Sequence, residues 1–433
     1  MMRSMYSGVS GLRVHQTKMD VIGNNISNVN TVGYKGGRVT FNEVFSQTLQ
    51  GASGESEASG KGGQNPMQVG LGANIASIDT LMTEGAAERT DNPLDLKIEG
   101  EGFFVVDDGS GFKFTRAGAF RVDESGNLVS PGGLKVMGWE PNSTTGEIER
   151  GRVEALEILS PNNLYSEPEQ TTDCYLEGNI DRNDPQLDPA NGGVPFTTSF
   201  YDSLGYRYTA EMTLTSTAVD TDYSITVGSI KDSDGNNIMT GSDSATITFD
   251  PATGKIDDSG TTEIELTGMG GVTGFSEISD PLNLDLSQLT LFAGKTSIES
   301  VRGDLEGVGA GRESGTMSGF SIGPDGKIEG RYTNGENKLL GQVVVTEFRN
   351  PAGLEKVGNN LFQATTNSGD FDGIGEDPTA SGGSLNAGVL EMSNVDLSRE
   401  FTDMITTQRG FQSNSRIITS TDEMLQELVN LKR

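Results

Sequence analysis

Positively charged residues are scarce in this chain. Its 433 residues include 31 Lys and Arg against 62 Asp and Glu, so the formal net charge is −31. Binding to phosphate groups needs clustered Lys and Arg, and a strongly acidic protein repels such groups. The composition therefore argues against nucleic acid and against an anionic membrane surface as partners.

Long apolar runs are also missing. The start of the chain lacks the apolar core of about 7 to 15 residues that a cleaved secretory signal requires, and no stretch of the sequence is long enough to span a bilayer. We expect no membrane insertion. If the protein leaves the cell, it uses a route that reads an uncleaved N-terminus.

Cysteine and histidine occur once each, as Cys174 and His15. A single cysteine excludes an internal disulfide framework and a thiolate-rich zinc site. A single histidine within an expected helix argues against a Ser-His-Asp or Cys-His catalytic arrangement. We therefore expect a protein that is not an enzyme and that holds no cofactor.

Two short segments have only a superficial likeness to ligand-binding loops. Residues 307–311 are rich in glycine, but a third glycine at the spacing of a dinucleotide-binding loop is missing, and so is a surrounding βαβ unit. Residues 232–236 place oxygen ligands at alternate positions, with Asp243 twelfth in the count, but Asn237 stands where a calcium loop needs glycine. The second segment favours a plain hairpin turn over a calcium site.

Apolar residues recur at alternating steps of three and four at both ends of the chain, which predicts two long amphipathic helices. The first should end in the turn-forming residues 28–33, and the second should begin after a cap at Asn394 or Asp396. Such stripes also fit core helices of a globular domain. We favour an assembly role, because both stripes are terminal and nearly neutral, whereas residues 160–300 carry 23 Asp and Glu against 5 Lys and Arg.

Between the helices the periodicity changes to two, which predicts strands. A polar stretch rich in Gly, Ser and Gln predicts a connector, and similar strand-turn-strand phrases on both sides of the acidic middle suggest one β-domain interrupted by an inserted antiparallel one. The expected fold is mainly β with long terminal helices and nested β-domains. The expected divisions are a helical domain (1–35 plus 390–433), a connector (36–85), an inner β-domain (86–160 plus 300–389) and an inserted outer β-domain (161–299).

Several motifs in these regions resemble the flagellar rod and hook axial protein family. The long, specific ones stand at the two ends: Asp20 to Lys35, Leu390 to Leu397, and Gln408 to Arg416. Further similarity runs through Gly100 to Val105, Thr115 to Gly118, and Gly341 to Phe348. The resemblance covers most of the chain outside residues 160–300.

The resemblance implies a structural subunit of the bacterial flagellar hook, which polymerises with itself into a flexible tube and acts as a universal joint between rod and filament. The implied location is the extracellular flagellum beyond the basal body. The implied partners are other copies of the chain, the flagellar rod, the hook cap, the hook-length control protein, the hook–filament junction proteins and the type III export apparatus.

In that family the terminal helices form a coiled coil on assembly, which agrees with a seam that has no core to cover it. The predicted assembly interface consists of Met5, Val9, Leu12, Met19, Ile22, Asn24, Asn25, Ile26, Asn28, Leu397, Phe401, Met404, Phe411, Ile418, Leu425 and Val429.

Two other functions stay open on sequence grounds. A distal flagellar rod subunit is suggested by residues 51–68, which resemble an extra stretch of the rod protein, although the inserted acidic domain favours the hook. A secreted β-rich adhesive or binding protein would need exposed aromatic or apolar residues in the inserted domain, where Tyr and Phe are only modestly represented.

Overall fold

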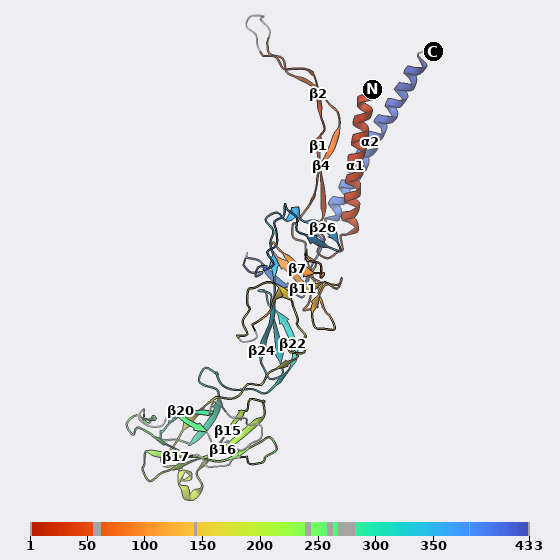
Figure 1. Ribbon diagram of the computed structural model, residues 1–433. Helices are drawn as coiled ribbons and strands as arrows, with labels where there is room; N and C mark the ends of the chain where they lie inside the picture. Colours follow the sequence, from red (N-terminus) through yellow and green to blue (C-terminus); the bar gives the residue numbers. More distant parts are fainter. Residues whose placement is uncertain are drawn as a thin grey trace. The chain divides into compact units, whose positions relative to one another are not determined.

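The structure is a computed structural model that describes residues 2–54, 62–142, 145–238, 244–257, 263–266, 282–380 and 382–431. Asp243 of the calcium-like segment lies outside the described residues. The fold is mainly β with one long helix at each end, which confirms that part of the predicted fold class (Figure 1). The chain divides into two compact units: unit 1 is residues 1–160, 320–329 and 339–433, and unit 2 is residues 161–319 and 330–338.

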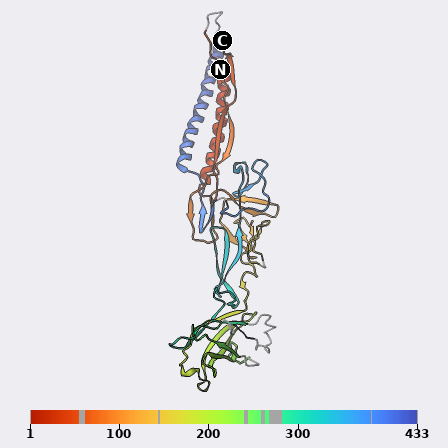
Figure 2. The same cartoon turned by 90° about the vertical axis from the view of Figure 1, so that its left-hand side faces the viewer.

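The two helices of unit 1 are α1 (Met2–Ser27) and α2 (Leu397–Asn430). Asp396 caps α2, because its side chain accepts hydrogen bonds from the backbone N–H groups of Ser398 at 2.9 Å and Arg399 at 3.4 Å. After α1 the chain turns back at Gly33, which has a φ of +68°. The helices lie side by side in Figures 1 and 2. No helix in the described ranges is long and apolar enough to cross a membrane.

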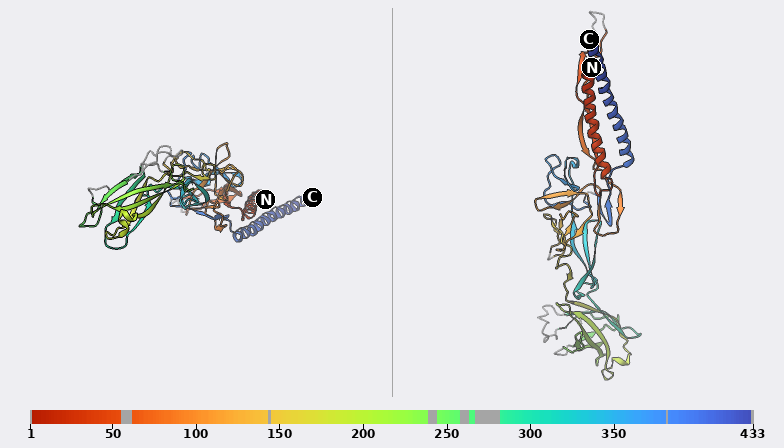
Figure 3. Two further views of the ribbon diagram at one scale, coloured as in Figure 1. Left: turned by 90° about the horizontal axis from the view of Figure 1, so that it is seen from below. Right: turned by 90° about the vertical axis from the view of Figure 1, so that its right-hand side faces the viewer.

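Residues 36–85, for which composition predicts a connector, contain four strands. β1 (Gly37–Glu43) pairs antiparallel with β4 (Ala73–Thr80), and β2 (Ser46–Gln50) pairs antiparallel with β3 (Met67–Gly70). Together they form a two-stranded ribbon that runs beside the helices (Figure 3). The apolar residues Met67, Val69 and Leu71 occupy every second position, which is the period of a β-strand.

The remaining β structure of unit 1 surrounds a core of aromatic side chains. Phe103, Phe114, Phe348 and Phe362 pack mainly edge to face, with ring centroids 4.8 to 6.0 Å apart. Trp139 is buried in the same core and donates hydrogen bonds from its indole N–H to two backbone carbonyls. The strands are β5 (Ala87–Arg89), β6 (Leu96–Glu99), β7 (Phe103–Asp107), β8 (Phe112–Thr115), β9 (Arg121–Val122), β10 (Leu128–Val129), β11 (Lys135–Trp139), β12 (Glu154–Ala155), β25 (Val345–Thr346), β26 (Glu355–Gly358), β27 (Leu361–Gln363), β28 (Ser384–Ala387) and β29 (Val389–Glu391).

Three strands contain the boundaries between the units: β22 (Gly315–Ile322), β23 (Lys327–Tyr332) and β24 (Asn337–Val343). Unit 2 itself contains two four-stranded sheets, ordered β19-β20-β14-β21 and β15-β16-β17-β18, whose buried residues form one core. Its strands are β13 (Tyr165–Ser166), β14 (Asp173–Asn179), β15 (Val194–Tyr201), β16 (Arg207–Ser216), β17 (Asp222–Lys231), β18 (Ser244–Thr248), β19 (Glu263–Leu266), β20 (Leu282–Thr290) and β21 (Ser297–Arg302).

The expectation that this part of the chain is antiparallel throughout is wrong for one strand pair. β14 and β20 run parallel, with Cys174 opposite Leu284. Parallel pairing needs a long crossover connection, and here the whole second sheet lies in sequence between the two strands. The alternation of apolar and polar residues identifies each strand. It carries no information about whether a partner strand far away in the sequence runs parallel or antiparallel.

Candidate assembly interface

The two terminal helices contact each other within one chain and run antiparallel. Gly8 of α1 lies against Ile418 of α2, and Gly11 lies against Asn414; further along, His15 of α1 lies against Gly410 of α2. The approach is close at two of these points, since a Cβ at Gly11 would stand 2.6 Å from Asn414 Nδ2 and a Cβ at Gly410 would stand 2.7 Å from the His15 ring, so a larger residue would displace the facing side chain. Side chains of one helix therefore fill spaces left by glycines of the other.

Polar groups continue this seam toward the start of α2. Lys18 Nζ lies 3.8 Å from Asp403 Oδ1, and Asn25 donates a 3.2 Å hydrogen bond from Nδ2 to Glu400 Oε1. Burial raises the pKa of Glu400 above its ordinary value, although the bond from Asn25 opposes that rise. The contact between the helices thus combines small and polar residues with apolar ones such as Ile418, and the polar pairs help to specify its register.

In α1, the predicted residues take three kinds of position. Ile22 and Asn25 are buried, and Asn24 is exposed. The others are partly buried: Met5, Val9, Leu12, Met19 and Ile26 in the helix, and Asn28 directly after it. Asn25 is satisfied inside the chain, because its Oδ1 accepts from Gly37 N at 2.9 Å and its Nδ2 donates to Gly37 O at 2.8 Å. This pair of bonds joins the end of α1 to the first strand of the ribbon.

In α2, the predicted residues Met404, Phe411, Ile418 and Leu425 are partly buried. Leu397, Phe401 and Val429 are exposed, Phe401 with 50% of its surface accessible and Val429 with 70%. The buried residues of α2 are Thr407 and Thr421, and neither belongs to the predicted interface. Only the glycines at 8, 11 and 410 could have indicated this face in advance, because they mark where two helices approach closely.

Several further apolar side chains of α2 have no cover within the chain. The helix has 34 residues against 26 in α1, so its last two turns extend beyond the pairing. The exposed apolar residues of α2 are Leu397, Phe401, Ile405, Ile417, Met424, Leu428 and Val429. So many uncovered apolar side chains on one helix indicate a surface that another protein covers.

The ribbon presents a second uncovered apolar surface. Phe45 is 72% exposed and Leu49 is 59% exposed, and Val44, Met67 and Val69 are exposed as well. At its helix-proximal part, Phe41 contacts the His15 ring edge-on with centroids 6.2 Å apart. A two-stranded ribbon is marginally stable alone, so these side chains need a partner surface.

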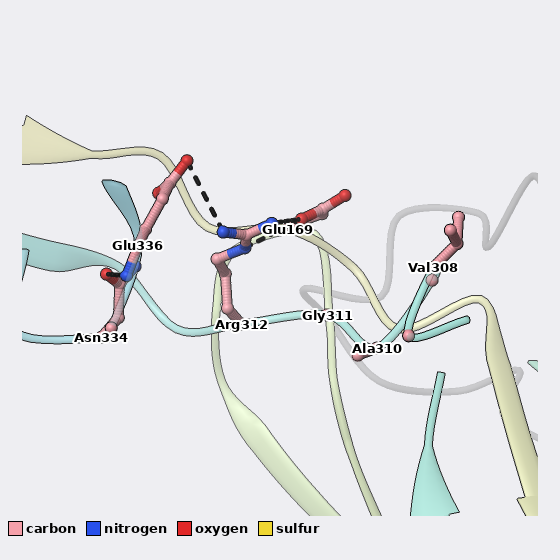
Figure 4. A pocket seen from close by; sticks show the side chains of 10 residues that line it. Glu169, Val308, Ala310, Gly311, Arg312, Asn334 and Glu336 are labelled. Atoms are coloured by element: carbon pink, nitrogen blue, oxygen red, sulfur yellow. Dashed lines mark hydrogen bonds and ion pairs between the residues drawn. The ribbon is translucent and has the colours of Figure 1, made fainter. Parts of the chain in front are cut away.

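Unit 2 contains an open cavity of about 470 Å³ beside the 307–311 loop (Figure 4). Arg312 projects into it and donates from Nε to Glu169 Oε2 at 2.9 Å, while its other guanidinium nitrogen lies 3.6 Å from Glu336 Oε1. The guanidinium is thus engaged by the chain's own carboxylates. These ion pairs connect Arg312 to Glu169 and Glu336, which lie in segments of unit 2 that are distant in the sequence.

The remaining sequence candidates in unit 2 are structural. Asp232 Oδ1 accepts hydrogen bonds from the backbone N–H groups of Asp234 and Asn236, which is the bonding of a tight turn. Cys174 is buried in β14, and burial raises the pKa of its thiol to about 12. Across the described ranges, no three His, Cys, Asp or Glu side chains are grouped to hold a metal ion.

Paired terminal helices with uncovered apolar surfaces define a structural protein that associates with other protein surfaces. Comparison with known families agrees: residues 5–35 match the flagella basal body rod protein model, residues 97–166 match the flagellar hook protein FlgE/F/G D1 domain, and residues 386–431 match the flagellar basal body rod FlgEFG protein C-terminal model.

Full-length relatives define the family further. The chain is 38% identical to the flagellar hook protein FlgE of Borreliella burgdorferi and 36% identical to that of Treponema pallidum, in each case over 100% of both chains. It is 31% identical to the flagellar basal-body rod protein FlgG of Bacillus subtilis, again over 100% of both chains. The chain belongs to the flagellar hook protein family, a family of structural flagellar proteins.

Proposed function

We propose that this chain is the subunit of a flagellar hook, in which copies of the chain polymerise into a flexible tube through α1, α2 and the ribbon. The observation that carries this proposal is the uncovered apolar surface of α2, where Phe401, Ile405 and Val429 are each at least 50% exposed. A repeated contact between unlike surfaces of identical subunits generates an open helical polymer when its rotation does not close into a ring.

Each part of the chain then has a role in the proposed tube. The terminal helical domain (1–35 plus 390–433) and the inner β-domain (86–160 plus 300–389) build its wall, with the connector (36–85) between neighbouring subunits. The inserted outer domain (161–299) has 23 Asp and Glu against 5 Lys and Arg, so it carries more than half of the net negative charge, which keeps this part from associating nonspecifically. Sliding contacts between such domains would allow the tube to bend while it transmits torque.

The proposal includes location and partners. The tube would lie outside the cell beyond the basal body, joined to the rod at one end and to the hook cap and later the hook–filament junction proteins at the other. The chain would reach that place through the type III export apparatus without cleavage of its N-terminus, and a hook-length control protein would limit its growth. Family membership supports these points, and none of them requires a cofactor or an enzymatic step.

The substitution Phe401→Asp tests the assembly role of α2. Because half of the Phe401 side chain is accessible in the single chain, a carboxylate there should leave monomer stability nearly unchanged. In the polymer it would lose about 1 kcal/mol of apolar burial per subunit, for the half of the ring that assembly can cover, and add a desolvation cost of at least similar size. We expect no pelletable polymer from this variant in sedimentation, with a monomer melting temperature close to that of the native chain.

Thr402→Asp is the matched control, since Thr402 is the exposed neighbour of Phe401 on the same turn. This control should form tubes visible by electron microscopy. Tubes from Phe401→Asp equal in yield to those of the control would refute the assignment of α2 to the interface.

A distal rod subunit is the second candidate function, and the 31% identity to the Bacillus subtilis rod protein favours considering it. The two functions differ in the mechanics of the polymer. A hook subunit should give curved, bendable tubes, whereas a rod subunit should give straight, stiff ones. Electron micrographs of polymer from the native chain therefore distinguish them.

A further inference from the structure

Three charged side chains of unit 1 are buried together where both terminal helices join the β structure. Lys35, which follows α1, is 1% exposed; Arg116, which follows β8, is 4% exposed; Glu391, the last residue of β29, is fully buried. These residues lie in the motifs at 20–35, 115–118 and 390–397, yet none of them contributes to the uncovered apolar surface. Their role therefore needs a separate account.

Glu391 is the centre of this cluster. Its Oε1 accepts hydrogen bonds from Lys35 Nζ at 2.6 Å and from Gly85 N at 2.9 Å. Its Oε2 lies 3.6 Å from a guanidinium nitrogen of Arg116. The backbone of Glu391 takes part as well, because its carbonyl accepts from Gly33 N at 2.8 Å. One residue thus binds the segment after α1 through both its side chain and its backbone.

The two cations have few other neutralising partners. Lys35 Nζ also donates to Thr83 O at 2.8 Å, and Arg116 donates to Gly100 O at 2.9 Å, but both acceptors are uncharged. The nearby carboxylate of Glu84 forms an ion pair with Lys97. Burial lowers the pKa of Lys35, and the Glu391 carboxylate opposes that change. The charge of Glu391 is therefore what keeps two buried cations compatible with the folded state.

The space around the cluster leaves the connecting segments only one way to pack. A Cβ at Gly85 would stand 1.8 Å from Met392 O, and a Cβ at Gly33 would stand 2.7 Å from Ala117 N. Backbone from four parts of the chain thus meets at van der Waals contact around the ionic group. Such close packing lets a single charge fix the direction in which both helices leave the β structure.

We propose that Glu391 is the positioning residue that fixes the two terminal helices to the β part of unit 1. Its carboxylate holds Lys35 behind α1 and Arg116 on the β part, while its own backbone leads toward α2. The helix pair is then attached to the β part through a charge-dependent junction beside the aromatic core, where the Arg116 guanidinium lies 5.3 Å from the centroid of the Phe103 ring. Loss of the charge should release the segments on both sides of the helices and leave the core folded.

Glu391→Gln in the full-length chain tests this proposal, because glutamine keeps an oxygen for Lys35 and Gly85, whereas it removes the charge and the second oxygen that faces Arg116. We expect hydrogen exchange in residues 32–36 and 389–395 to become at least about a hundredfold faster, while exchange in β11 stays at the native rate. The double variant Lys35→Gln/Glu391→Gln returns the cluster to its native net charge of +1, so it should restore most of the protection. Asp325→Asn, which removes a carboxylate paired with the half-exposed Lys327 elsewhere in unit 1, is the control and should exchange like the native chain in these segments.

Three results would overturn the proposal. The first is native-like exchange of residues 32–36 and 389–395 in Glu391→Gln, or no protection of these segments in the native chain. The second is an equal loss of protection in β11, or failure of Glu391→Gln to fold, which would make Glu391 an ordinary core residue. The third is a double variant no better protected than Glu391→Gln. Exchange is measured without polymerisation, so these results are separate from the test of the hook proposal.

Discussion

The chain's single histidine lies at a point where its protonation affects how the helices pack. His15 fills the space over Gly410, its ring meets Phe41 of the ribbon, and its Nδ1 is buried without a hydrogen-bond partner. Burial lowers the pKa of His15, and the adjacent charge of Lys18 adds to this effect. The neutral ring is therefore the form that fits the seam.

The pKa shift predicts a loss of stability in acid. Because protonation is harder in the folded state than in the unfolded chain, the contribution of neutral His15 is complete above about pH 6.5 and is lost as the pH falls below that value. We expect the thermal unfolding of the helices, followed by circular dichroism, to shift to lower temperature between about pH 7 and pH 5.

His15→Gln isolates the histidine from the many carboxylates of the chain. Glutamine is neutral at both pH values, so the variant should show a smaller shift than the native protein. An identical shift in both proteins would assign the acid sensitivity to other groups.

At the level of secondary structure elements, the long helices could be predicted from sequence, whereas the small and polar residues of their contact could not. The apolar stripe of α2 indicates a helix by its period, and its member Ile418 lies against Gly8 of α1. The buried Thr407 and Thr421, and Asn414 at Gly11, lie outside that stripe. Small and polar residues give no hydropathy signal, so periodicity alone does not find them.

The ribbon and the ionic cluster were beyond sequence reasoning for different reasons. Residues 46–70 are dominated by Gly, Ser and Gln, which is the composition of a linker, yet strand pairing at residues 46–50 and 67–70 orders part of them. The cluster joins Lys35, Arg116 and Glu391, which are far apart in the sequence and each part of a different local pattern. Only the tertiary fold brings them within bonding distance.

The cap of α2 yields a prediction at this scale. Asp396 accepts from two backbone N–H groups of the first turn, so Asp396→Ala leaves both without their partner. We expect the helix to lose about 1 kcal/mol of stability, measured by chemical denaturation with helical circular dichroism as the readout. Ser398→Ala, at an exposed position of the first turn, should change the stability by much less. Equal effects of the two substitutions would show that the cap contributes nothing beyond general helix fraying.

For the whole molecule, the two units suggest that the outer part can be removed. Gly303 N donates to Asp173 O at 2.7 Å, so the chain leaves and re-enters the same place in unit 2. Deletion of residues 174–302 with a direct join removes both four-stranded sheets of unit 2 except for the start of β14 and should leave unit 1 intact. We expect the shortened chain to polymerise, with tubes that bend less uniformly in electron micrographs. A shortened chain that folds and is exported but never polymerises would place essential contacts in unit 2.

The unequal length of the terminal helices has a consequence for the direction of growth. A pair in which α2 exceeds α1 by eight residues, 34 against 26, offers a bare stretch of helix at one end and none at the other. Stacking such pairs lays every overhang the same way along the stack, so the two ends of the resulting fibre are chemically distinct. Such a fibre is polar from its first few subunits, so an incoming subunit meets a different surface at each end.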